Sequence, residues 1–116
     1  MSGALWMAEF SLLHADGYAA TGNVYTTVGT LARAASFMTQ ALFALNETYF
    51  MNDKSAVQEM AAFALLPPDY LPRLARLLGQ SGQTAAELQA SVGELRTLWA
   101  GIVDLTHGAY RPAFRL

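Results

Sequence analysis

The feature that most constrains the fold is one long, largely apolar segment from Asn23 to Phe50. It is more than 25 residues long and contains no proline and a single glycine, Gly29. Its hydrophobic residues recur with helical spacing in two sets: Leu31, Ala35, Met38, Leu42, Leu45 and Tyr49 on one stripe, and Phe37, Ala41 and Ala44 on much of another side. A helix that is apolar on most sides is typical of the centre of a bundle. With Asn23 as its N-cap residue, this segment predicts a long central helix.

Helical spacing and capping signals predict further helices on both sides of this segment. Before it, residues at intervals of four and three share one face of a helix that ends near Gly22, namely Trp6, Phe10, Leu13 and Gly17. After it, helices are expected over residues 55–66, 69–78 and 84–105, with Pro67 and Pro68 stopping the first of these.

Two capping boxes and one hydrophobic seam support these boundaries. Ser55 with Gln58 and Thr84 with Glu87 have the pattern in which two side chains cap the first turn of a helix. The last helix carries apolar residues at alternating intervals of four and three: Leu88, Val92, Leu95, Trp99 and Ile102. Such a seam is typical of a helix that packs at a shallow angle against its neighbours.

The chain of 116 residues is long enough for one hydrophobic core and too short for two. We therefore expect one all-α domain over residues 1–116, an up-and-down bundle of four to five helices around a long central second helix. The tail, residues 107–116, has no helical pattern. We expect it to be irregular and either to pack on the bundle as a strap or to fray.

Composition and charge exclude several classes of function. The net charge of −2 supplies no basic field for nucleic acid, so a whole-surface DNA or RNA binder is not expected. The absence of cysteine excludes disulfides, thiolate metal sites and cysteine nucleophiles. Hydrophobic residues make up 53% of the chain and charged residues only 14%, against about a quarter in a typical soluble domain. Some apolar surface is therefore expected to meet a partner.

A membrane-spanning helix is not expected, because polar residues interrupt the richest apolar run, at Arg33, Gln40, Asn46 and Glu47. The first ten residues contain no basic region before an apolar segment, so we expect no secretory signal. These two observations and the lack of cysteine favour the cytoplasm.

The common catalytic motifs are missing from the sequence. It has no phosphate-binding G-x-x-x-x-G-K-[ST] loop, no H-E-x-x-H pair and no G-x-S-x-G turn. The two histidines, His14 and His107, are far apart in the sequence, and a metal site built on them is not expected. No residue can be assigned as a catalytic base.

A polar cluster follows directly on the apolar helix and is the main candidate site. Lys54 supplies a compact positive charge, and Asn46, Tyr49 and Asn52 supply hydrogen-bonding groups that could orient a base, a sugar or an acceptor hydroxyl. Two further candidates, Arg33 and Gln40, are seven residues apart on one helix face and could line the same groove.

Structural roles are the alternative for each candidate. Asn46 and Tyr49 could cap and pack the helix end, and Lys54 could be a solvated turn residue near Asp53. Arg33 could instead pair with one of three carboxylates: Glu9, Asp16 or Glu47.

Residues 10–66 resemble the all-helical domain that follows the catalytic domain in small bacterial nucleotidyltransferases of the polymerase-beta-like superfamily. The sharpest part of the resemblance is the run L-x-A-L-N-x-x-Y-F-x-N-x-K from Leu42 to Lys54. In that architecture the catalytic domain carries a Gly-Ser motif and paired aspartates that hold the metal and the nucleotide. The helical domain closes the cleft and helps to choose the substrate.

This chain has no Gly-Ser followed by D-x-D, so the resemblance implies an excised C-terminal domain or a free-standing subunit. By this resemblance it has no activity alone and binds no cofactor itself, and its partner is a catalytic domain or chain that holds Mg²⁺ and a nucleoside triphosphate. The candidates Arg33, Gln40, Asn46, Tyr49, Asn52 and Lys54 would then contact nucleotide or acceptor.

Two other functions are considered. The first is a homo- or hetero-oligomeric interaction module without a ligand site, with apolar surface around Trp6, Phe63 and Phe114 buried between chains. The second is the RNase-type helical subunit that bacteria often pair with minimal nucleotidyltransferases, in which an Arg is followed four to six residues later by a His. Arg96 and His107 are too far apart for that pattern, and Arg33 has no following His in range.

Overall fold

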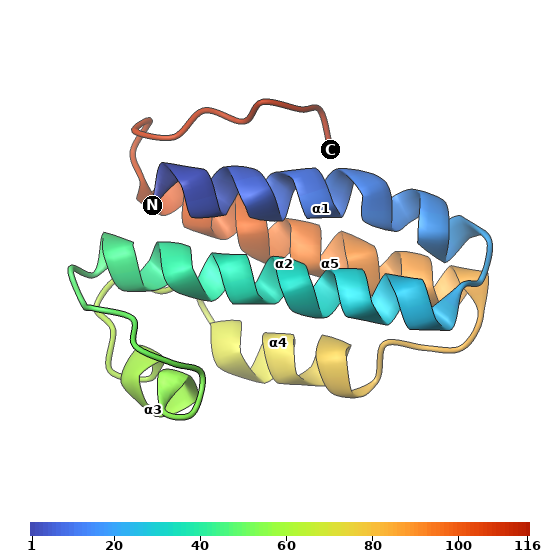
Figure 1. Cartoon of the computed structure of the whole chain (residues 1–116), viewed down its shortest axis with the longest axis horizontal. Helices are drawn as coiled ribbons and strands as arrows, with labels where there is room; N and C mark the ends of the chain where they lie inside the picture. The colour runs from blue at the N-terminus through green and yellow to red at the C-terminus, as the bar shows by residue number, and fades with distance from the viewer.

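The computed structural model describes all 116 residues and is an all-α bundle. The helices are α1 (Ser2–Ala20), α2 (Val24–Leu45), α3 (Ala56–Met60), α4 (Tyr70–Gly79) and α5 (Ala85–Leu105). In Figure 1, α1, α2, α4 and α5 run alternately in opposite directions, so the up-and-down bundle is confirmed. The short α3 lies at one corner below the end of α2.

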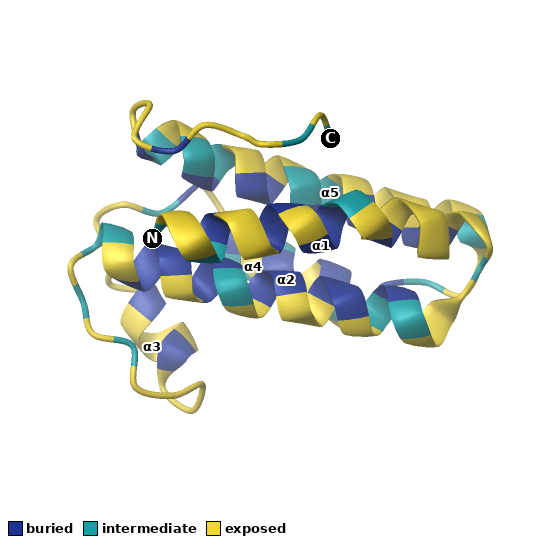
Figure 2. Ribbon diagram, turned by 45° about the horizontal axis from the view of Figure 1, so that its top comes forward, coloured by how far each residue is buried: buried dark blue, intermediate teal, exposed yellow.

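The core lies between the three long helices, with α4 closing one side. The fully buried aliphatic side chains come from all three: Leu5 and Leu12 of α1, Leu31, Met38 and Leu42 of α2, and Leu88, Leu95 and Ile102 of α5. Figure 2 shows the buried residues on the inward sides of these helices and the exposed ones outward. Burial of each such side chain stabilises the fold by about 1.5–3 kcal/mol. The predicted seam of α5 is confirmed, because all five of its residues are buried.

The central helix is shorter than predicted, because it ends at Leu45 and not near Phe50. Its start is confirmed, since the Asn23 side chain accepts a hydrogen bond from the Thr26 N–H. At its other end Glu47 has a φ of 55°, which a continuing right-handed helix does not allow. The residues after Leu45 therefore form an irregular connection, and Tyr49 points into solvent with 82% of its surface exposed.

The third helix is also shorter than predicted, since it covers Ala56–Met60 and not residues 55–66. The Ser55 hydroxyl bonds to Glu59, so the predicted capping box with Gln58 does not form. Beyond Met60 the chain turns so that Phe63 packs edge-on against Phe43 of α2, with ring centroids 4.9 Å apart. Aromatic packing thus takes the place of the last predicted turns.

The last two helices agree closely with the predicted ranges. α4 begins and ends one residue later than predicted. The capping box at the start of α5 is confirmed, because Thr84 and Glu87 cap each other's main chain. Main-chain N–H groups of Gln83 and Thr84 that donate to Glu87 hold the pKa of this carboxyl below its usual value.

The C-terminal tail packs as a strap along α1, as one of the two predicted arrangements requires (Figure 1). The Glu9 side chain of α1 is fully buried, and its carboxylate accepts hydrogen bonds from the Tyr110 hydroxyl and from the N–H groups of Ala113 and Phe114. The Phe114 ring lies against Trp6 at 6.0 Å between centroids. The buried Glu9 carboxylate and the contact of Phe114 with Trp6 together hold the tail on α1.

No helix in this bundle combines the length and the apolar character needed to cross a bilayer.

Candidate functional site

Asn46, the first member of the predicted polar cluster, is bound to main chain on both sides. Its amide nitrogen donates to the carbonyl oxygens of Leu42 and Leu65, each at 2.8 Å, and its oxygen accepts from the Leu65 N–H at 2.9 Å. The amide thus ties the end of α2 to the segment after α3. In this conformation its donors face main-chain carbonyls and not solvent.

The other three members of the cluster lie on an open loop. The Asn52 side-chain oxygen accepts from the Lys54 N–H at 2.9 Å and shapes the turn. The side chains of Tyr49 and Lys54 are exposed and form no hydrogen bond or ion pair within the chain. None of the five surface cavities is lined by residues 46–54. A ligand or partner at these residues would therefore lie on an open surface and not in a cavity.

Arg33 and Gln40 lie elsewhere, on the outer side of α2 where it packs against α1. None of the three carboxylates considered as partners for Arg33 pairs with it. Glu9 is bound by the tail, Asp16 pairs with Arg96 at 3.1 Å, and Glu47 forms no ion pair. The Arg33 guanidinium is exposed and has no hydrogen-bond partner in the chain. Its charge is therefore free for a ligand or another protein.

Arg33 lines a cavity of about 500 Å³ between α1 and α2, which we call the α1–α2 groove. The groove is lined from α1 by Met7, Phe10, Ser11, His14 and Tyr18, and from α2 by Tyr25, Thr26, Gly29, Thr30 and Arg33. None of these residues is acidic. Gln40 lines an adjoining shallow groove together with Trp6 and Phe37. Met7 lines both grooves.

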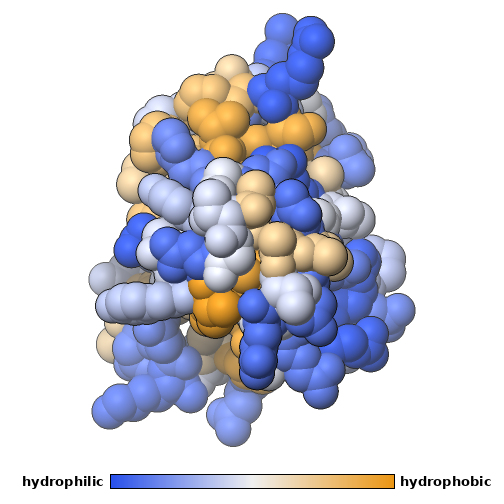
Figure 3. All heavy atoms as spheres, turned by 90° about the vertical axis from the view of Figure 1, so that its right-hand side faces the viewer, coloured by the Kyte–Doolittle hydropathy of each residue, from blue (hydrophilic) through white to orange (hydrophobic).

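Aromatic side chains form much of the α1 wall. Phe10 stacks on Trp6 at 5.3 Å and meets the His14 ring edge-on at 4.7 Å, both measured between ring centroids. Figure 3 views the end of the bundle where α1 turns into α2, and hydrophobic side chains gather in the upper part of this view. On α1 itself, Trp6, Met7 and Phe10 are exposed, so the hydrophobic surface that the composition predicts lies partly on this helix.

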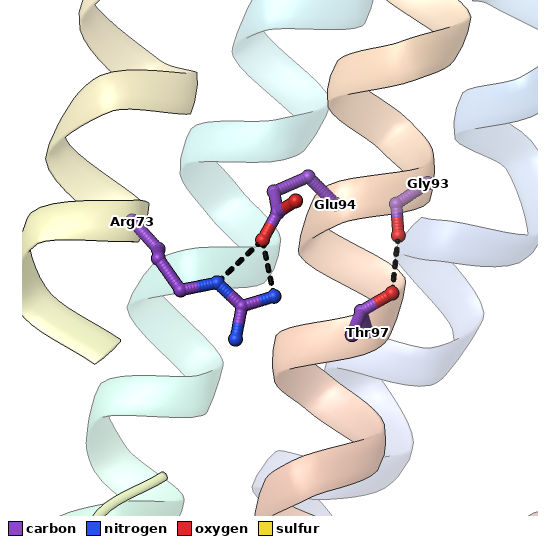
Figure 4. Close-up of polar contacts among 4 residues, drawn as sticks. All are labelled: Arg73, Gly93, Glu94 and Thr97. Carbon is purple, nitrogen blue, oxygen red and sulfur yellow. Dashed lines mark hydrogen bonds and ion pairs between the residues drawn. The ribbon is translucent and has the colours of Figure 1, made fainter. Parts of the chain in front are cut away.

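A second polar cavity lies between α4 and α5. Arg73 of α4 donates through Nε to the Glu94 carboxylate of α5 at 2.7 Å, and the two form an ion pair (Figure 4). One turn further on, Thr97 bonds only to the Gly93 carbonyl of its own helix. The cavity of about 360 Å³ also includes Arg76 and Glu87. Two arginines and two glutamates balance in charge, so this cavity is less suited to a charged ligand than the α1–α2 groove.

No group of three His, Asp or Glu side chains is arranged to hold a metal ion. His14 lies on α1 in the groove, and His107 follows α5 with a φ of 50°. Arg96 is held by Asp16 and by the Leu12 carbonyl at 3.1 Å.

Sequence reasoning found Arg33 but not the side chains that surround it. Phe10, His14 and Tyr18 recur at intervals of four, a spacing that predicts one shared ridge on a helix. That spacing was the available signal. On α2, Tyr25, Gly29 and Arg33 have the same spacing of four, but which face of α2 meets the α1 ridge depends on how the two helices pack.

Comparison with known proteins gives no relative: no family model, no curated protein sequence and no solved structure matches this chain.

Proposed function

We propose that this chain is the helical substrate-binding domain or subunit of a nucleotidyltransferase and has no activity by itself. In this proposal it closes the cleft of a catalytic domain, which holds Mg²⁺ and a nucleoside triphosphate, and it helps to bind nucleotide or acceptor. The location would be the cytoplasm. The sequence resemblance between residues 10 and 66 supplies the family, and the availability of the candidate side chains supports a binding role.

The observation that carries the proposal is that the fold leaves four of the six candidate side chains unused. Arg33, Gln40, Tyr49 and Lys54 are exposed and form no side-chain hydrogen bond or ion pair within the chain. All four belong to α2 or to the loop that follows it, which is the segment that carries the resemblance. Two cations and two uncharged polar groups, divided between α2 and the loop after it, suit contact with phosphate and hydroxyl groups.

An oligomeric interaction module without a ligand site is the second candidate, and the aromatic surface of α1 favours it. Trp6 and Phe10 each keep about two fifths of their surface exposed, at 39% and 40%. With Phe114 they form a contiguous aromatic cluster. Contiguous exposed aromatic side chains are common where proteins bind each other.

The test begins with this chain as bait in a lysate of its source organism. The retained proteins are identified by mass spectrometry, and any that carries the Gly-Ser and paired-aspartate motif is expressed with this chain. We expect transfer of labelled nucleotide to an acceptor that requires both chains. Arg33→Gln and Lys54→Gln should reduce the transfer.

The matched control is Arg76→Gln, which removes the same charge from an exposed, unpaired arginine on α4. It should leave the transfer unchanged. Transfer that does not need this chain would contradict the proposal. So would recovery of the chain only with itself, as a symmetric dimer that covers residues 46–54, and that result would favour the interaction module.

A further inference from the structure

We propose that the α1–α2 groove is a binding site for a small, flat aromatic anion, a planar ring system that carries a phosphate or a carboxylate. Binding would be a property of this chain alone. The inference therefore goes beyond the proposed function and does not need a catalytic partner. It rests on the charge of the groove, on its aromatic walls and on the space above Gly29.

The charge of the groove is positive and uncompensated. Arg33 is the only lining residue with a permanent charge, and no acidic side chain lines the groove. The acidic residues of α1, Glu9 and Asp16, both bind other groups. Glu9 binds the tail, and Asp16 pairs with Arg96. A planar guanidinium that is free in this way matches the geometry of a carboxylate or a phosphate and binds either with two parallel hydrogen bonds. The His14 ring supplies a further N–H donor on the opposite helix.

The walls of the groove suit the flat part of such a ligand. Met7 and Phe10 offer apolar surface, and Tyr18 and Tyr25 add an aromatic side chain from each helix at the end where α1 turns into α2. The side-chain hydroxyls of Ser11 and Thr30 donate to main-chain carbonyls of their own helices, at 3.0 and 2.7 Å. The polar side-chain groups left for a ligand belong to five residues and lie among aromatic surface, as in many small-molecule sites: His14, Tyr18, Tyr25, Thr26 and Arg33.

Gly29 keeps the groove open. A glycine inside a helix costs about 1 kcal/mol relative to alanine, and Gly29 lies well inside the 22-residue α2. Close packing does not require it, because a Cβ at this position would meet no atom within 4 Å. A larger side chain there would project into the cavity. The volume of about 500 Å³ accommodates a bicyclic aromatic ring with its anionic group.

Binding of 1-naphthyl phosphate to the whole chain tests the proposal, measured by calorimetry and by chemical-shift changes in the NMR spectrum. The two comparison probes are 1-naphthol, which has the ring without the charge, and inorganic phosphate, which has the charge without the ring. We expect 1-naphthyl phosphate to bind at least about tenfold more tightly than either, with shift changes at Tyr25, Gly29 and Arg33.

Two variants locate the site, and a third is the control. Arg33→Gln should weaken binding of 1-naphthyl phosphate about tenfold and leave that of 1-naphthol unchanged. Gly29→Leu should weaken binding of both aromatic probes, because its side chain occupies the cavity. The control variant Arg76→Gln removes the same charge from α4 and should have no effect.

Several results would overturn the inference. They are the absence of saturable binding, equal affinity for 1-naphthyl phosphate and either comparison probe, and equal weakening by Arg33→Gln and Arg76→Gln. The spectra of the free variants show whether each one is folded, so a loss of binding can be separated from unfolding. If the groove does not bind, the proposed function still stands, because nucleotidyl transfer is measured with the catalytic partner.

Discussion

Glu9 and Asn46 perform the same structural task at two places in the molecule. Each projects from a long helix and holds a segment of irregular chain through main-chain hydrogen bonds: Glu9 holds the tail at Ala113 and Phe114, and Asn46 holds the chain after α3 at Leu65. They differ in burial, since Glu9 is completely buried whereas Asn46 is partly exposed. A charged group without water depends wholly on its partners, so its loss should cost more.

Arg33 is free because distant segments occupy the polar groups near it. Glu9 was a plausible partner for Arg33 on sequence grounds, but the tail occupies its carboxylate. Asn46 was a plausible ligand contact, but its amide is bonded to Leu42 and Leu65. In both cases the main chain of a distant segment is the partner. The polar residues that remain for function are those that no such segment reaches.

The largest effect is expected for Glu9→Ala. The Tyr110 hydroxyl and two main-chain N–H groups would lose their acceptor in a buried place, so we expect a loss of about 3 kcal/mol in the free energy of unfolding. Denaturant unfolding measures it, and amide hydrogen exchange at Ala113 and Phe114 should become faster. Asp104→Ala, an exposed and unpaired carboxylate on α5, should stay within about 0.5 kcal/mol of the wild type. Equal effects of the two substitutions would refute the buried role of Glu9.

A smaller effect is expected for Asn46→Ala. It removes three hydrogen bonds, but water can reach some of the groups that are left, so we expect a loss of about 1–2 kcal/mol. Hydrogen exchange at the Leu65 N–H should accelerate while exchange at Phe114 stays slow. Asn52→Ala is the matched control, because that side chain bonds only within its own exposed turn. If Asn46→Ala leaves stability unchanged but weakens ligand or partner binding, Asn46 belongs to a site and the comparison with Glu9 fails.

The elements that depend on local sequence could be predicted, and those that depend on distant partners could not. The start of α2 follows from its N-cap residue Asn23. The helix α5 follows from the Leu88–Ile102 seam, and its capping box follows from Thr84 with Glu87. These signals act within one turn or along one helix face. The end of α2 was predicted five residues too late. There Asn46 bonds to Leu65, nineteen positions away, and that partner leaves no trace in the local periodicity.

The same distinction applies to the candidate site. Arg33 and Gln40 were predicted to share a groove, and they lie in two adjoining grooves on one helix face, because spacing along a helix determines which face a residue occupies. The four candidates between Asn46 and Lys54 were grouped by sequence proximity. They lie on an irregular connection without a cavity, and Asn46 is used by the fold. Whether any of the six contacts a substrate stays a prediction.

Alkaline pH should weaken the Glu9 contact and leave the Asn46 contact intact. Burial, together with the hydrogen bond to Glu9 and the charge of its carboxylate, raises the pKa of Tyr110 above its usual value. The protonated Tyr110 hydroxyl therefore contributes fully to stability below the pKa of an unfolded tyrosine, about 10. This contribution is lost as pH rises from there through the pKa of Tyr110 in the folded chain. Burial also raises the pKa of Tyr70, so both tyrosines contribute to the pH dependence of the wild type. The informative quantity is therefore the difference in pH dependence between the wild type and Tyr110→Phe.

In Tyr110→Phe, the free energy of unfolding should fall less steeply with pH above about pH 10 than in the wild type. In Asn46→Ala, the slope of the free energy of unfolding against pH should be the same as in the wild type. Unfolding followed at several pH values in both variants measures this. The effect should be smaller than that of Asn46→Ala at neutral pH, because only one of the three bonds to Glu9 is involved. A slope that is the same in Tyr110→Phe and in the wild type would show that this hydroxyl is not coupled to Glu9.

The smallest effect on stability is expected for Arg33→Gln. Because Arg33 is exposed and has no partner in the chain, removing its charge should change the free energy of unfolding by no more than about 0.5 kcal/mol. Thermal unfolding of this variant beside Arg96→Gln measures it, since Arg96 bonds to Asp16 and to the Leu12 carbonyl and should be the more costly loss. A loss above about 1 kcal/mol for Arg33→Gln would mean that the fold uses this guanidinium. Arg33 would then belong with Glu9 and Asn46, and the α1–α2 groove would lose the only permanent charge available to a ligand.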